Sequence, residues 1–568
     1  MPSFRSLGVA VRAASYVPPL ALLHHLRRRV RARLIPLRGA AFEVTLETEA
    51  SRLPPVAASP SAAAARAAET VAMYFAAKQA KNVPQCFDGK FTFLNRTHDF
   101  GGADKVDWRI DMDGGRYQLW RANLSFMGYL SPAIDADPKR GLALSAVLAR
   151  SFRRFARFDR SSVFSDAWNS YPVSQRILAL GTALIRLPTE LRGTEDARVT
   201  EDFLRFNVAY LLRNLETELG FNHLERNLSA LAIYALASGE TPPAVRKAIL
   251  ANFDHVVGET IGEDGVQLER SPMYQGLTIQ SLRVFRELDI WTPDQAALIA
   301  RRLQAAEAAL AAMTLGDDRP SLMNDGWFDE APRASQILGD YRVPGFVALR
   351  DAGYVRLARD GAVALFDAGP IGPDANPGHG HPDFLSLEMT LNGARLLVDP
   401  GTSGYSADAG RQRDRSWDQH NGPSITGGTP VEFLGSFKVG RRVAAVLDAA
   451  DETEGVQRAA GSLRFGDVVV RRDVSLTGST LTLADRWESG AGERVARFLV
   501  PSEWTAADVG PTGLTLERDG QTVRLSVSDA RLSIADSRWS CRYNLSEPAH
   551  EIVVRPVADR ATTMLTWV

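Results

Sequence analysis

Apolar residues recur at helical spacing from about residue 60 to about residue 340. Turn signals divide this region into segments that begin at Pro or after Ser, Thr or Asp and end near Gly, as helices do. Examples of the segments predicted as helices are 62–77, 142–158, 199–215, 227–237, 243–257, 277–288 and 293–313. No unit of fixed period repeats, so a closed or partly closed ring of uneven helical hairpins fits this half better than a solenoid.

From about Phe346 the spacing of apolar residues changes to two, which predicts strands. The predicted strands are 363–366, 384–391, 395–398, 443–447, 468–474, 481–487, 497–500, 513–517, 523–527 and 550–556. Asn392-Gly393 and Asp519-Gly520 lie between strands, as turns of antiparallel hairpins do. About ten short strands predict a large antiparallel sandwich rather than one small sheet.

The predicted organisation is a basic N-terminal segment (1–42), a helical domain (43–345) and an antiparallel β-sandwich domain (346–568), with the boundary at Pro344-Gly345. The first segment holds eight arginines and no acid before Glu43. Its apolar stretch is broken by Arg12 and Pro18-Pro19, which predicts neither a signal peptide nor a transmembrane span. Two interpretations stay open: a basic helix or tail against the domain or an acidic surface, and a processed targeting segment.

Charge and cysteine content exclude several classes of protein. With 66 Lys+Arg against 67 Asp+Glu, the chain has no overall basic surface for nucleic acid. The two cysteines, Cys86 and Cys541, lie 455 positions apart. That spacing provides neither a disulfide framework nor a cysteine metal site.

Three of the nine histidines, His379, His381 and His420, fall within 42 positions. The first two lie in a Gly/Pro-rich loop that enters a predicted strand, and Asp399 follows the next turn. Histidine nitrogens with a carboxylate form the ligand set of a zinc site. The alternative is that these histidines only satisfy backbone carbonyls.

The hairpin register bears on that choice. A two-residue turn pairs position 391 with 394, and therefore Ser386 with Asp399. His381 would then face away from Asp399. A metal site that these two residues share needs an irregularity, which we predict near Pro382.

The helical half also carries polar clusters, none of them specific alone. Asn222 and His223 open a predicted helix, where such residues usually act as caps. Tyr274 follows an acidic stretch and would ordinarily be half-buried packing. Asn324-Asp325-Gly326 reads most simply as a turn.

Taken in order, these stretches resemble the heparinase II/III-like polysaccharide lyases, a group that includes alginate and oligoalginate lyases. The resemblance rests on residues 168–177, Asn222-His223-Leu224-Glu225-Arg226-Asn227, 263–265 with 269–274, Gly378-His379-Gly380-His381-Pro382-Asp383, 399–402 and 420–422. It implies a multi-domain α+β protein with an N-terminal (α/α) toroid, or incomplete helical barrel, before the β-sandwich. It also implies β-elimination next to a uronic acid, which leaves a 4,5-unsaturated end.

The resemblance assigns roles to individual residues. Asn222 and His223 would face the uronate carboxylate, Tyr274 would act as acid and sometimes as base, and His379 would be the catalytic histidine of the sandwich domain. The implied metal ligands are His381, Asp399 and His420, holding a structural zinc or other divalent cation, with no organic cofactor. One departure is Arg226, which stands where relatives often have glutamate.

Arginines between Tyr405 and His420 suit an anionic sugar chain, because guanidinium binds carboxylate or sulfate through two hydrogen bonds. The predicted substrate-binding residues are Arg411, Arg413, Arg415, Tyr405 and Trp417. A solvated loop is the alternative interpretation of this cluster. The expected partner is therefore an anionic uronate polysaccharide or oligosaccharide, with no nucleic acid and no membrane span.

Family resemblance leads us to expect a periplasmic or secreted protein, with a cytoplasmic location still open and a homodimer one option for the oligomeric state. Two other functions stay open. An (α/α)-barrel glycoside hydrolase would use a pair of carboxylates among Glu263, Asp264 and Glu269. A non-catalytic polysaccharide-binding or assembly protein would keep the fold and tolerate the loss of Tyr274 or His379.

Overall fold

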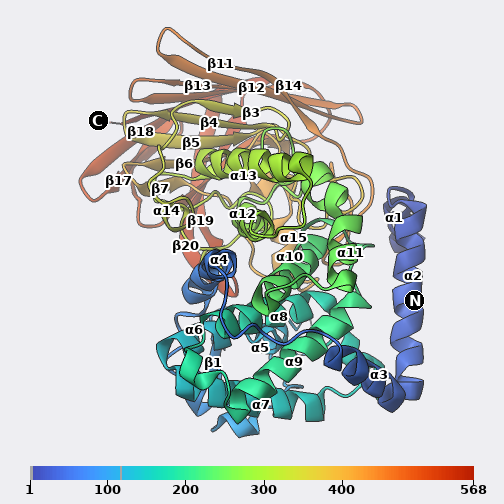
Figure 1. The fold of residues 1–568 in the computed structure, drawn as a ribbon. Coiled ribbons are helices and arrows are strands. Elements are labelled where there is room, and N and C mark those ends of the chain that lie inside the picture. Colours follow the sequence, from blue (N-terminus) through green and yellow to red (C-terminus); the bar gives the residue numbers. More distant parts are fainter. Residues whose placement is uncertain (1–3, 115–117, 568) are drawn as a thin grey trace. The chain divides into compact units, whose positions relative to one another are not determined.

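A computed structural model describes residues 4–114 and 118–567. The chain forms two compact units, each considered by itself below (Figure 1). The first unit comprises residues 1–17, 262–276 and 305–568, and the second comprises residues 18–261 and 277–304. Among the described residues, no helix is long and apolar enough to cross a membrane.

Helices dominate the chain up to Met313, as the spacing of apolar residues predicts. They are α1 (Phe4–Ser15), α2 (Pro19–Leu34), α3 (Gly39–Ser51), α4 (Ala62–Gln79), α5 (Leu119–Phe126), α6 (Leu130–Ala136), α7 (Pro138–Phe155), α8 (Ser170–Arg186), α9 (Glu195–Leu212), α10 (Phe221–Ser238), α11 (Pro243–Ala251), α12 (Pro272–Arg286) and α13 (Pro293–Met313). Two short helices follow, α14 (Ala334–Leu338) and α15 (Ala409–Asp414).

Side-chain caps and buried faces explain these helices. Asn169, Thr194 and Asp137 each accept a hydrogen bond from a backbone N–H in the first turn of α8, α9 and α7 respectively. Helix α8 lies at the centre of its unit, where it packs against α4, α9 and α10. It is buried on almost every side, so its sequence lacks the polar face of a surface helix.

The named strands of the C-terminal part all pair antiparallel. Its strands are β3 (Val347–Leu349), β4 (Tyr354–Arg359), β5 (Ala362–Asp367), β6 (Leu387–Leu391), β7 (Ala394–Leu397), β8 (Pro423–Ile425), β9 (Phe433–Leu434), β10 (Lys438–Val439), β11 (Ala445–Thr453), β12 (Val456–Phe465), β13 (Val468–Thr477), β14 (Thr480–Ser489), β15 (Arg494–Pro501), β16 (Thr505–Gly510), β17 (Gly513–Arg518), β18 (Gln521–Ser528), β19 (Ala530–Arg542), β20 (Leu545–Pro556) and β21 (Arg560–Trp567). A separate hairpin, β1 (Lys90–Phe93) and β2 (Arg96–Asp99), lies in the helical part.

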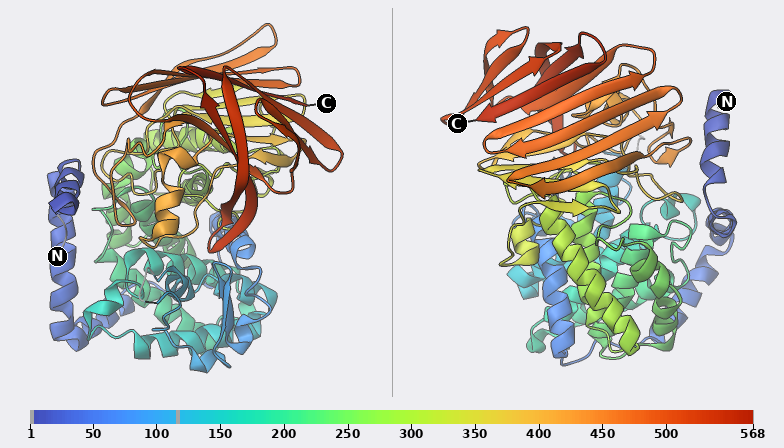
Figure 2. Two further views of the ribbon diagram at one scale, coloured as in Figure 1. Left: turned by 180° about the vertical axis from the view of Figure 1, so that it is seen from behind. Right: turned by 90° about the horizontal axis from the view of Figure 1, so that it is seen from above.

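Three sheets make up the sandwich. Their strand orders are β11-β12-β13-β14-β21-β18-β17-β16, β19-β20-β15-β8 and β3-β4-β5-β6-β7. Figure 2 shows the long strands β11 to β14 lying side by side. Buried apolar residues from all three sheets form one continuous core, which includes Leu483, Trp487, Phe498 and Phe366. Alternating burial along β14 directs every second side chain into this core.

Residues 262–276, although they precede α13, belong to the same compact unit as the sandwich. Arg270 donates to the backbone carbonyls of Asp351 and Ala352, and Gln275 donates to the carbonyls of Gly265 and Ala306. These bonds tie the first turn of α12 to the β-sheet part of the chain. As a result, the residues at the start of α12 are fixed relative to the loops of the sandwich.

The β6–β7 hairpin contains the irregularity that a site shared by His381 and Asp399 requires. Leu391 pairs with Ala394 as predicted, but the register shifts by one residue before Met389 pairs with Leu397. Carried two residues further, this register sets Asp399 opposite Leu387 rather than Ser386. The chain is also irregular near Pro382, as the sequence suggested: the N–H of Ser386 donates to the carbonyl of Asp383, Leu385 has φ of 60°, and the strand predicted from residue 384 begins only at Leu387.

Candidate functional site

Tyr274 and His379, which are 105 positions apart, lie against each other in one compact unit. Their ring centroids are 4.8 Å apart. The Tyr274 hydroxyl forms a 3.0 Å hydrogen bond with the hydroxyl of Tyr405. Tyr274 belongs to the first turn of α12, whereas His379 and Tyr405 come from loops of the sandwich domain. The fold therefore brings together a phenol and an imidazole, two groups suited to proton transfer.

Asp325 holds His379 in place. Its carboxylate accepts from Nδ1 of His379 at 2.8 Å, from Nε2 of His381 at 3.0 Å and from the guanidinium of Arg411 at 2.9 Å. Burial by itself raises the pKa of Asp325, but Arg411 and the two histidines outweigh burial and hold that pKa well below its usual range. Asp325 is therefore an anion that fixes Nδ1 of His379 and leaves Nε2 for other partners.

From their sequence, residues 324–326 are predicted only as a turn. The backbone does bend there, with φ of 60° at Asn324, but the same residues also organise the site. Asn324 accepts from the backbone N–H of His381 and donates to the hydroxyl of Tyr354. An Asn-Asp-Gly motif carries no sequence signal for such a role, because it is an ordinary turn composition.

Tyr405 supplies a neutral hydroxyl next to Tyr274. Burial, followed by the charge of Asp325, raises the pKa of Tyr405 well above its usual value. The Arg411 guanidinium lies 5.1 Å from the centre of the Tyr405 ring. Because Tyr405 keeps its proton, it is able to donate a hydrogen bond to Tyr274, which favours the ionised form of the Tyr274 phenol.

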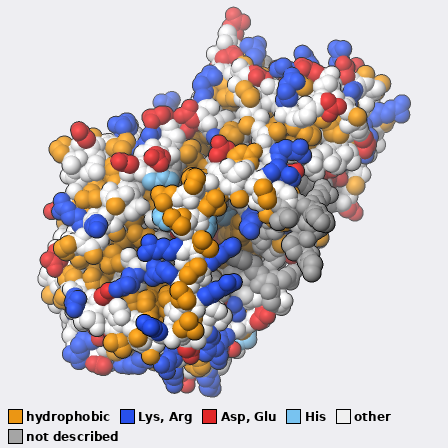
Figure 3. All heavy atoms as spheres, turned by 90° about the vertical axis from the view of Figure 1, so that its right-hand side faces the viewer, with side chains coloured by type: hydrophobic (Ala, Val, Ile, Leu, Met, Phe, Trp, Pro, Cys, Tyr) orange, Lys and Arg blue, Asp and Glu red, His pale blue; other side chains and the backbone are white. Residues whose placement is uncertain are grey.

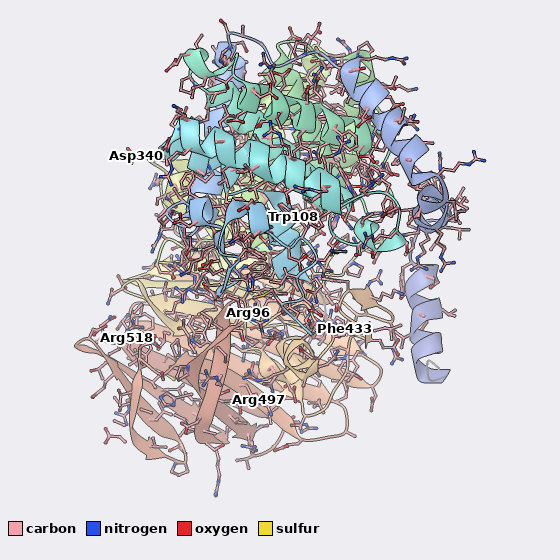
Figure 4. The ribbon with its side chains drawn as sticks, turned by 90° about the horizontal axis from the view of Figure 1, so that it is seen from below. Arg96, Trp108, Asp340, Phe433, Arg497 and Arg518 are labelled. Atoms are coloured by element: carbon pink, nitrogen blue, oxygen red, sulfur yellow. The ribbon has the colours of Figure 1, made fainter. Side chains whose placement is uncertain are left out.

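The predicted substrate-binding arginines all have partners inside the protein. Arg411 is buried and paired with Asp325, and Arg413 donates to the carbonyl of Arg538 at 2.8 Å. Arg415 donates to the carbonyls of residues 435 and 436, and lies 3.9 Å from the centre of the Phe433 ring, which Figure 4 labels. These contacts order the loop, and sugar binding by the cluster stays a prediction.

Trp417 has a similar environment. Only 2% of it is exposed, and its ring packs edge-on against Phe465 within the core of the sandwich. A stacking role on a sugar ring stays a prediction for this residue too.

His381 and His420, the two predicted metal-ligating histidines, lie beside each other with ring centroids 5.6 Å apart. Nδ1 of His420 contacts Asp399 at 2.7 Å, while Nε2 of His381 is bound to Asp325. The other ring nitrogen of each histidine is buried and has no hydrogen-bond partner within the described part of the chain. Metal-bound histidines commonly show this pattern, with one nitrogen on a carboxylate and the other facing the ion.

Burial lowers the pKa of His381 to about 4, so that this imidazole is neutral, as a metal ligand must be. The donor types therefore fit a zinc ion. Across residues 4–114 and 118–567, however, no group of three or more His, Cys, Asp or Glu side chains is spaced to hold a metal ion. In this arrangement Asp399 contacts His420, and the third ligand position is not formed.

Asn222 and His223 open α10 in the other compact unit, so the structure does not relate their position to Tyr274 and His379. Nδ1 of His223 lies 3.2 Å from the buried carboxylate of Glu216, and the ring packs 5.0 Å from Tyr171. Glu216 also pairs with Arg28 of α2 at 3.1 Å. Sequence reasoning did not identify Glu216, whose partners on α2 and α10 meet only in the fold.

The departure at Arg226 is explained within α10. Arg226 is buried and donates to Glu225 at 3.0 Å, as well as to Gln280 and Ser281 of α12. Thr278 donates to the other oxygen of Glu225 at 2.7 Å. Glu225 and Arg226 thus form a buried ion pair on α10, and both partners are hydrogen-bonded to α12.

Glu216 gives a pH-dependent prediction. Burial opposes its charge, but His223 and Arg28 lower its pKa to about 2. A carboxylate with a lowered pKa stabilises the fold above its unfolded pKa and loses that contribution as pH falls. Glu216→Gln is therefore expected to cost about 3 kcal/mol near neutral pH. The difference from wild type should shrink as pH falls from about 4.5 towards about 2.

Urea unfolding at a series of pH values measures this effect. The control is Glu190→Gln, which removes an exposed carboxylate of the same unit. A gap between wild type and Glu216→Gln that does not change with pH would contradict the assigned ion pairs.

Comparison with known proteins places the fold. Residues 342–568 match the family described as heparinase II/III-like, C-terminal. The crystal structure of heparinase III has a TM-score of 0.68 and 14% identity, covering 95% of this chain and 91% of that one. The heparan sulfate lyase HepC from Pedobacter heparinus has a TM-score of 0.56 and 14% identity, with coverage of 96% and 90%. No match is found among curated protein sequences.

Both solved structures are too distant in sequence to show more than the fold. They confirm the predicted architecture of a helical toroid followed by an antiparallel β-sandwich. The family match covers the sandwich, including the loops that carry His379, His381 and His420. Residues 342–568 thus match the heparinase II/III-like C-terminal domain, and the chain shares the fold of the heparinase III structure.

Proposed function

We propose that this protein is a polysaccharide lyase that cleaves a uronic-acid-containing chain by β-elimination. The observation that carries the proposal is the contact between Tyr274 and His379, with Asp325 fixing the imidazole and Tyr405 facing the phenol. The heparinase and heparan sulfate lyase structures of the same fold support it.

In this reaction the base removes the proton on C5 of the uronate, the C4–O bond breaks, and a C4–C5 double bond forms. The departing oxygen takes up a proton from the acid. The proton on C5 is weakly acidic, so the enzyme must neutralise the neighbouring carboxylate and supply a base and an acid. We assign the binding of the uronate carboxylate to Asn222 and His223. We assign the proton transfers to Tyr274 and His379.

Tyr274 needs help to act as a base at neutral pH, because an unperturbed phenol has a pKa of about 10. Tyr405 provides a donated hydrogen bond for the phenolate at 3.0 Å. His379, held through Nδ1, presents Nε2 for the substrate. After elimination, the proton gained by Tyr274 is available for the leaving oxygen, so that one phenol can serve both steps.

The alternative of a glycoside hydrolase requires a free pair of carboxylates. Asp264 does not supply one, because its two oxygens accept from the backbone N–H groups of Val266 and Ala352. Glu269 accepts from the side chain of Gln267 at 2.7 Å. The other oxygen of Glu269 lies 4.0 Å from Nε2 of His379, so this carboxylate faces the imidazole of the proposed lyase site.

The test is ultraviolet absorbance of the new double bond while the protein is incubated with heparan sulfate, alginate, glucuronan and other uronate polymers. Rising absorbance with the wild type and none with Tyr274→Phe would support the lyase and identify its polymer. Release of reducing ends without absorbance would indicate a hydrolase. Binding without either product would indicate a non-catalytic polysaccharide-binding protein.

We also propose that His381, His420 and Asp399 hold a divalent cation, with zinc favoured by the donor set. The adjacent imidazoles with their two buried, unpartnered nitrogens support this assignment. When bound, the ion would act as a structural cross-link for the loop that carries His379. It supplies no activated water, because β-elimination needs none.

Metal removal should therefore lower stability more than it changes the chemical step. Treatment with EDTA is expected to lower Tm by about 5 °C, while kcat stays near the untreated value at a temperature where the protein remains folded. Elemental analysis of the purified protein gives the metal content, and His420→Ala should reduce it. Protein purified without any bound metal, and with a Tm unaffected by EDTA, would contradict the assignment.

A further inference from the structure

A concave site outside the Tyr274–His379 cluster lies under helix α2. The cavity has a volume of about 510 Å³, opens to solvent, and is lined only by residues of the helical unit. Its walls are α2, the segment that leads into α8, and the segment between α9 and α10. This volume is within the range of ligand sites and can hold one or more sugar rings.

The lining is strongly basic. It includes Arg27, Arg28, Arg29, Arg31 and Arg213, with His24 and His25, against a single acid, Glu218. Figure 3 looks onto the side of the molecule where α2 lies in Figure 1, and shows Lys and Arg side chains gathered there among hydrophobic ones. A concave surface of one charge concentrates ligands of the opposite charge.

Part of this positive charge is already compensated by the protein. Arg28 pairs with Glu216 at 3.1 Å and Glu218 at 2.7 Å, and Arg213 pairs with Glu49 at 2.7 Å. These bonds, with Arg31 donating to the carbonyl of Arg213, attach α2 to its unit.

The remaining charge is not compensated. Arg27, Arg29 and Arg31 make no ion pair within the described residues. Burial, followed by the charges of Arg27 and Arg213, lowers the pKa of Arg31. Several guanidinium groups thus repel one another across the cavity, and a bound anion would neutralise their positive charge.

The cavity lies next to residues assigned to the uronate carboxylate. Its wall includes Asn169 and Ser170, which directly precede Tyr171, and Thr217 and Glu218, which follow Glu216. Tyr171 packs against His223, and Glu216 pairs with it. A sugar chain held at His223 has this basic cavity beside it.

We propose that the cavity is a subsite for an anionic sugar residue, whose carboxylate or sulfate is bound by Arg27, Arg29 and Arg31. This proposal rests on the lyase function proposed above. Guanidinium groups recognise carboxylate and sulfate through paired hydrogen bonds. The basic N-terminal segment thereby acquires a role in substrate recognition.

The test compares two double variants that remove the same charge. Arg27→Ala/Arg29→Ala changes the cavity lining, while Arg33→Ala/Arg38→Ala removes two exposed arginines outside it. Both are made in a Tyr274→Phe background, so that turnover does not consume the probe. Calorimetry measures the Kd of a heparan sulfate hexasaccharide, with maltohexaose as the neutral counterpart.

The cavity variant is expected to raise the Kd of the hexasaccharide about tenfold or more, and the control variant about twofold at most. Maltohexaose should not bind at the cavity. Equal Kd values for the two variants would overturn the proposal, as would inorganic phosphate binding as tightly as the hexasaccharide. If the protein cleaves no uronate polymer, but the cavity variant still loses affinity for the hexasaccharide, the two proposals separate. The lyase function is then rejected, and the anionic sugar site is supported.

Discussion

Asp325→Ala is expected to destabilise the protein by about 3–5 kcal/mol, because it leaves the buried guanidinium of Arg411 without its counter-ion. The same change releases Nδ1 of His379 and Nε2 of His381. Misorientation of a catalytic imidazole through loss of its supporting carboxylate costs about 10–100-fold in sites of this kind. We therefore expect losses of both stability and turnover from one substitution.

Urea unfolding gives the stability, and initial rates on the cleaved polymer give kcat for whatever variant remains folded. Asp325→Asn keeps the shape of the side chain and separates the two effects, since it retains a hydrogen-bond acceptor but no charge. Asp329→Ala is the matched control, because it removes an exposed carboxylate four residues away, which pairs with Arg542 at 3.1 Å. An exposed pair contributes about 1 kcal/mol or less. Equal unfolding curves for Asp325→Ala and Asp329→Ala would show that Asp325 does not organise the site.

Tyr274→Phe is expected to lower kcat by about 10²–10⁴-fold, the range for removal of a general acid or base. Stability should change by only about 1 kcal/mol, because the ring keeps its place against His379 and only the hydrogen bond to Tyr405 is lost. Circular dichroism and Tm establish that the variant is folded before its rate is measured.

Tyr405→Phe is the control for that hydrogen bond. It removes the same bond from the other side and leaves the Tyr274 hydroxyl in place. We expect a smaller loss of kcat, together with a shift of the ascending, low-pH limb of the pH–rate profile to higher pH, since the phenolate loses a donor. If Tyr405→Phe were inactive and Tyr274→Phe active, the proton-transfer roles of the two tyrosines would have to be exchanged.

The local pattern of the sequence was sufficient for much of the fold. Helix α13 occurs at the predicted residues, Pro293–Met313, and the first strand of the sandwich begins at Val347, where the spacing of apolar residues changes. Helical and strand periods are properties of neighbouring residues, so that they can be read without knowledge of the fold. The limits predicted for the three domains stay a prediction.

The sequence pattern did not reveal elements in which burial or small side chains hide the alternation of apolar and polar residues. Helix α8 is buried on nearly all sides and so shows no polar face. Strand β12 does alternate in burial, but Ala459 and Gly461 occupy inward positions, where small side chains conceal the alternation. The sequence predicted an irregularity in this region but not the bulge in the β6–β7 hairpin. The position of an extra residue depends on the packing of the sheet.

The sequence by itself determined the order of a helical half and a β-sheet half, and it singled out the clustered His379, His381 and His420, whereas Tyr274 was identified only through the family resemblance. Only the tertiary structure decided which groups act together. Tyr274 and Tyr405 are 131 positions apart, and Asp325 and Arg411 are 86 apart. Such contacts leave no periodic trace in the chain, because they arise from the meeting of separate loops. The sequence predicts Asp325 only as part of a turn. The meeting of these loops places it at the centre of the cluster.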